Sequence, residues 1–220
     1  MIMAQSARDF VSEDAPVEKT GASESSFFAI VSRMRYIERW ALMRNARAEN
    51  LAEHSLDVAM IAHALCVIAN VRYGRALDAN RAALVGLYHD ATEIITGDMP
   101  TPVKYRNERL SGAYKEVEGE AAGELLQTLP DDLRPVLTEA FACRQDDPQD
   151  VYLFELVKAA DKISAYIKCL EEEASGNAEF RNAAASTLAA IERMREGHPE
   201  LGDFMDEFLP PYGRTLDELL

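Results

Sequence analysis

The segment from Tyr88 to Glu93 contains three side chains that could together do metal chemistry. His89 offers a nitrogen ligand, Asp90 offers an oxygen ligand, and Glu93 could transfer a proton. Adjacent residues on a helix point about 100° apart, so His89 and Asp90 can share an ion only if it lies over the seam between them. Glu93 follows His89 by four residues and therefore lies on the same side of a helix. The alternative is a partly buried histidine beside a solvated acid.

Two residues elsewhere in the chain could supply further ligands. His54 begins a predicted helix, which places its ring at the rim of a bundle where it could reach an ion. Asp161 lies in the middle of an apolar helical face, and an unpaired carboxylate buried there would cost several kcal/mol. A metal ion would satisfy Asp161, and so would a solvated ion pair with Lys158 or Lys162.

The other two histidines are expected to lie outside the ligand set. His63 belongs to the same apolar stretch as His54, so we interpret it as a core residue or as a residue that supports the ligands. His198 lies in a predicted loop, and we assign it no role.

The elements that must position these residues are predicted to be helices, because apolar residues recur at helical spacing and no convincing alternating run appears. We predict an all-α fold, an irregular multi-helix bundle. Residues 1–22 are expected to form a disordered or loosely attached tail, and residues 23–220 a single domain. The predicted helices span residues 23–40, 53–70, 78–96, 107–128, 130–141, 151–175, 177–196 and 199–209, with a final turn at 215–218. Residues 41–52 are predicted to be a loop, and so are residues 97–102, because of their two prolines.

The composition excludes several partners. The chain has 220 residues, a formal charge of −15 and a pI near 4.7, which argues against binding to a nucleic acid polymer or an anionic membrane. Its three cysteines follow no metal-binding or disulfide spacing, which is typical of a reducing compartment. The N-terminal segment has no apolar core of a signal peptide, so we expect a cytoplasmic protein.

The order of the histidine and aspartate motifs resembles the HD-domain superfamily of metal-dependent phosphohydrolases. Longer segments are similar to the bacterial 5′-deoxynucleotidase family of the YfbR type, from about Ser26 to the C-terminus. The segment before Ser26 is longer than is usual in that family. The resemblance is carried by five segments, which contain Arg39-Trp40, Glu53-His54-Ser55, Tyr88-His89-Asp90-Ala91-Thr92-Glu93, Thr96-Gly97-Asp98-Met99-Pro100-Thr101-Pro102 and Ala160-Asp161-Lys162.

This resemblance implies a one-metal enzyme that hydrolyses deoxyribonucleoside 5′-monophosphates to a deoxyribonucleoside and phosphate. The implied metal ligands are His54, His89, Asp90 and Asp161. Such a mixed nitrogen and oxygen set suits a divalent transition metal such as Co²⁺ or Mn²⁺ better than Ca²⁺. The residues do not identify the metal, the preferred base or the pathway. A homodimer is also implied.

The resemblance assigns catalysis to Glu93, Arg39 and Asp90. Glu93 would activate water or protonate the leaving 5′-oxygen, Arg39 would orient the phosphate, and Trp40 would press on the deoxyribose and exclude a 2′-hydroxyl group. The implied substrate contacts are Arg39, Trp40, His54, Asp90, Asp98, Met99, Pro100, Thr101 and Asp161.

Each of these roles has a structural alternative. Glu93 could be a surface glutamate of a helix, and Trp40 could be a core or interface aromatic residue. Arg39 belongs to a local positive stretch that could be a solvated helix face; the stretch consists of Arg33, Arg35, Arg39, Arg44 and Arg47. Two other functions also stay open. One is an HD phosphohydrolase for a nucleoside triphosphate or an alarmone, and the other is a non-catalytic sensor of metal and nucleotide.

Overall fold

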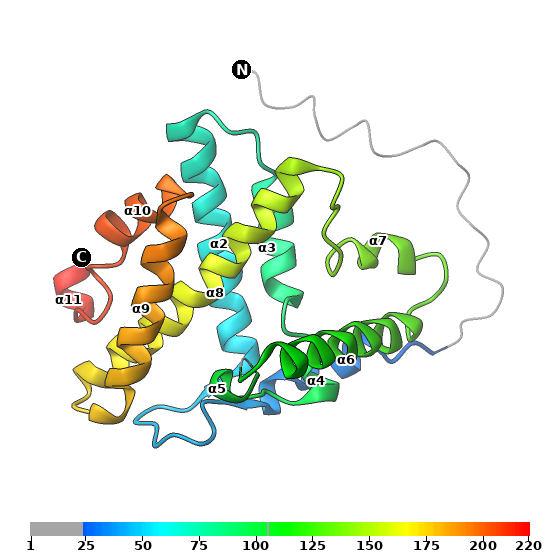
Figure 1. The fold of residues 1–220 in the computed structure, drawn as a ribbon, viewed down its shortest axis with the longest axis horizontal. Coiled ribbons are helices and arrows are strands. Elements are labelled where there is room, and N and C mark those ends of the chain that lie inside the picture. The colour runs from blue at the N-terminus through cyan, green and yellow to red at the C-terminus, as the bar shows by residue number, and fades with distance from the viewer. Residues whose placement is uncertain (1–23, 105) are drawn as a thin grey trace.

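The computed structural model describes residues 24–104 and 106–220, and this part of the chain is almost entirely helical (Figure 1). The predicted all-α fold is confirmed. The predicted N-terminal tail lies outside the described residues, and the division into a tail and one domain stays a prediction. In chain order the elements are α1 (Phe27–Val31), the 3₁₀ helix η1 (Ser32–Tyr36), β1 (Glu38–Arg39), β2 (Glu49–Asn50), α2 (Leu51–Tyr73), α3 (Ala79–Tyr88), α4 (Glu93–Thr96), α5 (Thr101–Lys104), α6 (Glu108–Gln127), α7 (Arg134–Thr138), α8 (Pro148–Ala174), the 3₁₀ turn η2 (Ala178–Phe180), α9 (Arg181–Arg195), α10 (Pro199–Asp203), the π-helical turn η3 (Phe204–Phe208) and α11 (Leu216–Leu219).

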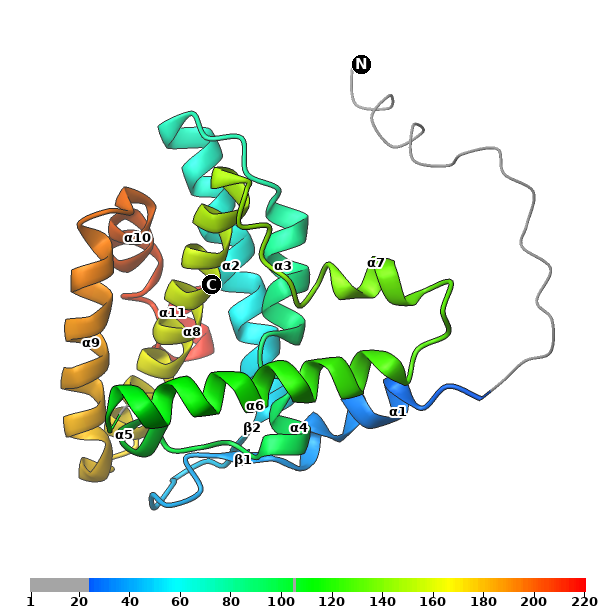
Figure 2. The same ribbon diagram turned by 45° about the vertical axis from the view of Figure 1, so that its right-hand side comes forward.

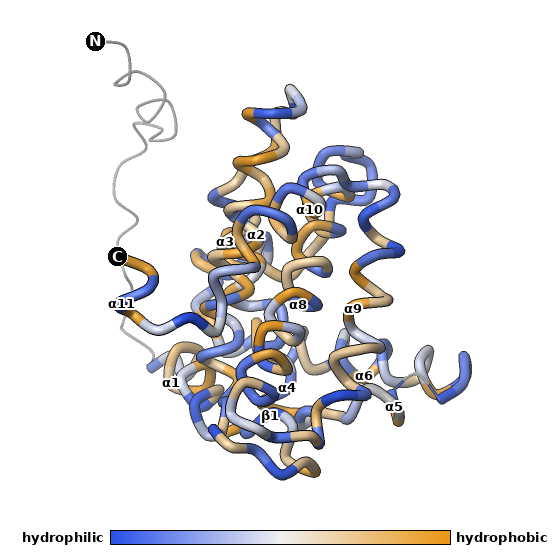
Figure 3. Tube along the Cα trace, turned by 90° about the vertical axis from the view of Figure 1, so that its left-hand side faces the viewer, coloured by the Kyte–Doolittle hydropathy of each residue, from blue (hydrophilic) through white to orange (hydrophobic). Residues whose placement is uncertain are grey.

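Helix α2 lies at the centre of the bundle, between α3 and α8 (Figures 1 and 2). Figure 3 shows apolar segments along these three helices, where they pack together. Among the described residues, α2 is the one helix long and apolar enough to cross a membrane, but 56% of its apolar window is buried inside the protein. That burial is what the core helix of a soluble bundle shows.

The prediction that α2 is covered on all sides is wrong. One stripe of the helix remains exposed and apolar; it consists of Leu56, Met60, Val67 and Val71. His63 lies within the same stripe and is exposed, so it is not the core or supporting residue that the sequence predicted. Its apolar neighbours misled the prediction, because α3 and α8 cover only the other sides of α2.

Helix α2 begins two residues earlier than predicted because Asn50 caps it. The Asn50 side chain accepts hydrogen bonds from the N–H groups of Ala52 and Glu53, and the Glu53 carboxylate accepts one from the N–H of Asn50. This reciprocal capping box satisfies N–H groups that the first turn leaves unpaired. It places His54 in the first turn of α2, where its side chain is fully buried.

The predicted helix over residues 78–96 is interrupted at the His-Asp pair. Asp78 caps α3 as expected, since its side chain accepts from the Arg81 N–H, but α3 ends at Tyr88. Hydrogen bonds between residues three apart then replace the α-helical pattern. They run from the Ala91 N–H to the Tyr88 carbonyl and from the Glu93 N–H to the Asp90 carbonyl. Residues 89–92 are therefore a turn between α3 and α4.

The first helix is also much shorter than predicted. Helix α1 ends at Val31, η1 ends at Tyr36, and the chain then extends into β1, which pairs antiparallel with β2. Apolar spacing suggested a helix to Trp40, but the cross-strand pairs Glu38 with Asn50 and Arg39 with Glu49 stabilise an extended backbone instead. Residues 41–52 are thus not a simple loop, because they include β2 and the start of α2.

The remaining predicted elements are confirmed with shifted ends. Residues 97–102 were predicted to be non-helical throughout, whereas α5 begins at Thr101. Pro102 is compatible with the first turn of this helix. The N–H groups of a first turn make no hydrogen bonds within the helix, so the N–H that proline lacks is not needed there. The two caps predicted downstream, Asn177 and the Thr215–Glu218 capping box, are both present.

A buried ion pair joins α3 to α8. Arg81 donates to both carboxylate oxygens of Asp150, from Nε at 2.5 Å and from Nη2 at 2.9 Å. Its guanidinium also donates to the carbonyl groups of Glu139 and Ala142. The paired donors and acceptors are mutually satisfied, which is the condition under which buried charge is tolerated. The pair fixes the N-terminal parts of the two helices against each other.

Gly86 sets the distance between α2 and α3. A Cβ atom at this position would lie 2.8 Å from the Cα and 2.9 Å from the backbone nitrogen of Ala59. Real Cβ atoms do not approach backbone that closely, so any side chain would push the helices apart. The carbonyl of Gly86 also accepts a hydrogen bond from His89 Nδ1 at 2.8 Å, so the distance between α2 and α3 affects the position of the His-Asp turn.

We therefore expect Gly86→Ala to destabilise the protein by about 1–3 kcal/mol, the usual cost of overpacking a dense core. Urea unfolding monitored by circular dichroism measures this change. The matched control is Gly119→Ala in α6, where nothing lies near the added Cβ and removal of a helical glycine should stabilise by about 0.5–1 kcal/mol. Equal effects of the two substitutions would contradict the close approach.

Candidate metal centre

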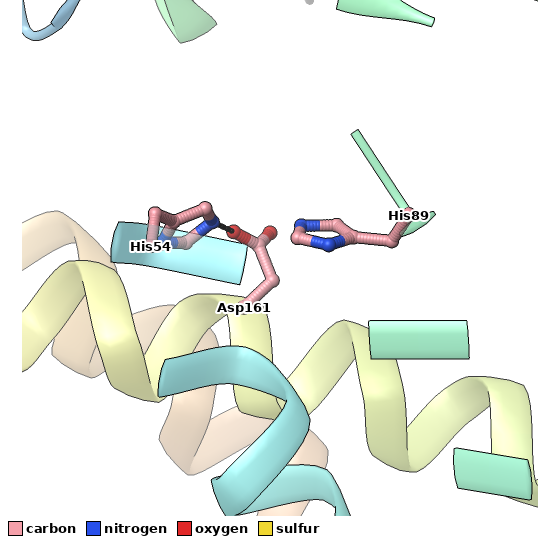
Figure 4. Close-up of side chains that lie close together, drawn as sticks. All are labelled: His54, His89 and Asp161. Atoms are coloured by element: carbon pink, nitrogen blue, oxygen red, sulfur yellow. Dashed lines mark ion pairs between the residues drawn. The ribbon is translucent and has the colours of Figure 1, made fainter. Parts of the chain in front are cut away.

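Four side chains from α2, α8 and the His-Asp turn converge on one point. The His54 Nε2 atom lies 3.2 Å from Asp161 Oδ1 and 3.7 Å from Asp90 Oδ2, and the His89 Nε2 atom lies 3.0 Å from Asp90 Oδ2. One ligand atom from each of His54, His89 and Asp161 falls within 4.8 Å of the others. In Figure 4 the Asp161 carboxylate lies between the two imidazole rings. The spatial convergence predicted from the sequence is therefore observed.

A hydrogen bond at Nδ1 orients each imidazole ring, which leaves both Nε2 atoms directed toward the carboxylates. His54 Nδ1 lies 3.0 Å from Ser164 Oγ of α8, and His89 Nδ1 donates to the Gly86 carbonyl. The Nε2 atoms of both rings are buried and have no hydrogen-bond partner of acceptable geometry. Metal-binding histidines typically show this arrangement, with one nitrogen oriented by a hydrogen bond and the other directed at the ion.

Local charges shift the pKa values of the two imidazoles in opposite directions. Burial, followed by the nearby Arg39 charge, lowers the pKa of His54, so this ring is neutral near pH 7. Burial would also lower the pKa of His89, but the adjacent Asp90 carboxylate outweighs it and raises the pKa to about 9. A metal ligand must be unprotonated, so metal binding at His89 would release a proton.

Of the two alternatives for Asp161, the structure shows the ion pair with Lys162, and the metal ligand stays a prediction. Burial would raise the pKa of its carboxyl group, but contacts with His54 and Lys162 hold it well below the ordinary value. Its Oδ2 atom lies 2.7 Å from Lys162 Nζ, while its Oδ1 atom faces His54. One oxygen of the carboxylate thus forms an ion pair and the other faces the centre. Lys158 is exposed and is not the partner that the alternative named.

Glu93 is buried, so it is not the surface glutamate of the alternative interpretation. Glu93 is 7% exposed, and its Oε2 atom has no hydrogen-bond partner. Burial and the negative charges of Asp90 and Asp98 raise the pKa of Glu93 to about 9. A carboxyl group with a pKa this high can carry a proton near neutral pH.

Arg39 is the one member of the positive stretch that faces inward. Its side chain is 12% exposed, and Nη2 lies 4.0 Å from Asp161 Oδ1, whereas the other four arginines are exposed. Burial alone would lower the pKa of Arg39, but the charges of Glu49 and Asp161 raise it above its ordinary value. The guanidinium is therefore a permanent positive charge beside the centre. The solvated-helix-face alternative is therefore wrong for Arg39, and it does not describe Arg44 and Arg47 either, because these two lie between β1 and β2.

Trp40 and the segment after Gly97 lie beside this arginine. The Trp40 ring is half-buried and packs against Phe180, with ring centroids 5.4 Å apart. The Asp98 carboxylate accepts a hydrogen bond from the Trp40 backbone N–H, and burial raises the pKa of Asp98. Met99 is partly buried and Pro100 is exposed, where its carbonyl accepts the first backbone bonds of α5. Thr101 begins α5.

Three contributors to this region were not predicted. Glu49 accepts from the Arg39 side chain, Ser164 holds the His54 ring, and Gly86 holds the His89 ring. Ser164 stands three residues after Asp161, on the same face of α8, which is a signal the sequence did contain. Glu49 carried no such signal, because it was assigned to a loop. His198, assigned no role, contacts Glu155 and lies away from the centre.

Comparison with known proteins identifies the family. The YfbR-like 5′-deoxynucleotidase family matches residues 26–212. The chain belongs to this family. It is 44% identical over 199 residues to the 5′-deoxynucleotidase YfbR of Escherichia coli and 44% identical over 195 residues to the 5′-deoxynucleotidase of Erwinia tasmaniensis; each match covers 89% of this chain and 96% of the relative. The predictions of a hydrolase and of the 5′-deoxynucleotidase family are confirmed.

Solved structures confirm the fold of this YfbR-like protein. An HD-domain phosphohydrolase from Listeria innocua superposes with a TM-score of 0.72 at 23% identity, covering 85% of this chain and 88% of that one. The HD phosphohydrolase of cyanophage S-2L, bound to dA and one catalytic Zn²⁺ ion, superposes with a TM-score of 0.57 at 22% identity, covering 86% and 98%. The fold is thus the HD-domain fold.

We expect Ser164→Ala to weaken metal binding by about 10–100-fold, because the hydrogen bond that orients the His54 ring is lost. Isothermal titration of the metal-free protein with Mn²⁺ measures the affinity directly. Ser186→Ala is the matched control, since Ser186 is exposed on α9 and its hydroxyl bonds only its own helix. An unchanged affinity in Ser164→Ala would contradict the orienting role of the Ser164 hydroxyl.

Proposed function

We propose that the protein hydrolyses deoxyribonucleoside 5′-monophosphates to a deoxyribonucleoside and inorganic phosphate, with a divalent metal at the convergent site. One observation carries this proposal: two buried imidazole nitrogens without hydrogen-bond partners face two carboxylates beside a buried arginine, in a member of the YfbR-like family. The relatives named above are 5′-deoxynucleotidases.

The residues fit one divalent transition metal, for which we propose His54, His89, Asp90 and Asp161 as ligands. The unpaired Nε2 atoms and the lowered pKa of Asp161 are properties of groups ready to bind a cation. When bound, such an ion neutralises charge on phosphoryl oxygens and lowers the pKa of a coordinated water. The ligand chemistry suits Co²⁺, Mn²⁺ and similar ions and does not distinguish among them.

The chain's own side chains supply charge and proton transfer. Arg39 would bind a phosphate oxygen, because its Nη2 points toward the centre and its charge is permanent. Glu93 would be the proton-transfer group, protonating the leaving 5′-oxygen or taking a proton from water. Burial and the charges of Asp90 and Asp98 raise its pKa to about 9, and a further positive charge at the centre would lower it toward neutrality, the range that suits acid-base catalysis.

The sugar and the remaining substrate contacts would lie on the Trp40 side of the centre. Trp40 would press on the deoxyribose and leave no room for a 2′-hydroxyl group. The segment that begins at Asp98 and includes Met99, Pro100 and Thr101 would border the sugar and phosphate, since Asp98 already bonds to the Trp40 backbone. No described group is committed to reading the base.

A substrate panel tests this proposal. With Co²⁺ or Mn²⁺ the protein should release phosphate from dAMP, dGMP, dCMP, dTMP and dUMP much faster than from AMP and GMP, measured by a colorimetric phosphate assay. Glu93→Ala should lower kcat by about 10²–10⁴-fold while elemental analysis still finds the metal. Equal rates on AMP and dAMP would refute the deoxyribose preference, and pyrophosphate release from a triphosphate would favour the other HD chemistry.

We also infer a cytoplasmic homodimer. All three cysteines are free, which suits a reducing compartment. The apolar stripe of α2 is exposed, and so are Leu84 and Leu87 of the neighbouring helix α3; exposed apolar surface of this kind is typical of a subunit interface. A twofold axis across this stripe would bring the same residues of both copies together.

Light scattering coupled to gel filtration tests the dimer. The native protein should elute with about twice the chain mass, and Met60→Asp should shift it toward the monomer, because a charge would be buried in the interface. Val117→Asp is the matched control, since Val117 is similarly exposed on α6, away from the stripe. A monomeric native protein, or dimers in both variants, would refute this interface.

A further inference from the structure

A single carboxylate oxygen connects the two residues proposed to contact phosphate and sugar. Glu49 Oε2 accepts a hydrogen bond from Arg39 Nη1 at 2.6 Å and another from Trp40 Nε1 at 3.2 Å. The Glu49 side chain is 12% exposed, so water competes little for these bonds. Hydrogen bonds to an ionised acceptor in such surroundings are among the strong ones in proteins.

Neighbouring residues do not ordinarily share a partner in this way. Along an extended strand, successive side chains point to opposite faces, so Arg39 and Trp40 should diverge. Trp40 instead has a φ of 58°, the one positive φ of a non-glycine residue in the described part of the chain. This left-handed conformation turns the indole to the side of the guanidinium, and Arg39 Cζ lies 5.9 Å from the ring centroid.

A left-handed conformation is unfavourable for a bulky residue and persists only where surrounding contacts stabilise it. Such contacts hold the Trp40 backbone and ring, among them a hydrogen bond from the Met43 N–H to the Trp40 carbonyl at 2.8 Å. The backbone carbonyl accepts from Asn45 Nδ2, the backbone N–H donates to Asp98, and the ring packs on Phe180. The indole N–H is the remaining polar group, and Glu49 is its partner.

Glu49 also restrains the guanidinium of Arg39. It occupies Nη1, while Nη2 faces Asp161 at 4.0 Å on the other side. In the β1–β2 pairing Glu49 lies directly opposite Arg39, and it stands one residue before the cap of α2. The same carboxylate thus ties the phosphate side and the sugar side to the helix that carries His54.

We propose that Glu49 is a positioning residue that couples Arg39 to Trp40, so that phosphate orientation and rejection of a 2′-hydroxyl group depend on one carboxylate. The substrate roles of Arg39 and Trp40 in this statement rest on the proposed function. Glu49 itself need not touch the substrate. Its effect should appear in the choice between deoxyribose and ribose, which loss of general stability would not change.

Kinetics of two variants separate its two contacts. Glu49→Ala should lower kcat/KM for dAMP by about 10–100-fold, the size expected for loss of a hydrogen bond to a charged group, and should reduce the preference for dAMP over AMP. Glu49→Gln keeps an oxygen acceptor for the indole N–H but removes the charge opposite Arg39. It should therefore lower kcat/KM while retaining most of the preference.

A double-mutant cycle tests the indole contact. Trp40→Phe keeps an aromatic ring and lacks the N–H, so adding Glu49→Ala to it should reduce the dAMP preference no further. Additive losses in the double variant would show that Glu49 does not act through this bond.

Fluorescence gives a readout that needs neither substrate nor metal, because Trp40 is the only tryptophan in the chain. Glu49→Ala should lower the steady-state anisotropy of Trp40 and increase its quenching by acrylamide. The matched control is Glu38→Ala, an exposed carboxylate on the same strand pair, which should leave both unchanged.

The two proposals fail in different ways. Unchanged fluorescence and an unchanged dAMP preference in a folded Glu49→Ala protein would overturn the role of Glu49. If Glu49→Ala does not fold, the same two measurements are made on Glu49→Gln. A lower anisotropy of Trp40 or a lost dAMP preference in Glu49→Gln would contradict the coupling. Retention of both, with a lowered kcat/KM, supports the coupling. If the native protein hydrolyses no deoxynucleotide while the fluorescence changes as expected, the proposed function fails and the coupling stands.

Discussion

The structure depends on keeping several charged and polar groups together where water is largely excluded. Two carboxylates, a guanidinium and an ammonium surround two imidazoles, and isolated burial of any of these charges would be costly. The cost is reduced because Asp161 and Arg39 each have a partner of opposite charge, Lys162 for Asp161 and Glu49 for Arg39. The groups left without partners, the two Nε2 atoms and one oxygen of Glu93, point to where chemistry can occur.

The backbone around this centre is irregular at His89 and Asp90, whereas His54 and Asp161 lie on regular helices. Adjacent helical residues cannot easily direct both side chains at one ion, and the turn after α3 removes that conflict, bringing His89 Nε2 to 3.0 Å from Asp90 Oδ2. The left-handed conformation of Trp40 has a similar effect on the other side of the site. Long, well-capped helices hold these two irregular segments in place.

Residue types and spacing in the sequence were enough to find the ligand candidates, the all-α class and most helix positions. His54, His89, Asp90 and Asp161 do meet, and Glu93 is buried as its proposed role requires. Periodicity failed where long-range contacts override it, as at Glu38 and Arg39, where strand pairing replaces a helix. It also could not tell which side of α2 faces solvent, so His63 was misplaced. Glu49 was missed because its partners depend on a hairpin that no local pattern indicates.

The Arg81–Asp150 pair has a mechanical consequence for the ligands. It fixes α3 and α8 about 12 Å before His89 and about 16 Å before Asp161, counted at the helical rise per residue. Any tilt of one helix relative to the other therefore has this ion pair as its pivot. A relative tilt of a few degrees about that pivot would move the ligand atoms by about 0.5 Å, the tolerance within which a metal geometry must be held. The rigidity of this ion pair thus controls how precisely the four proposed ligands are held relative to one another.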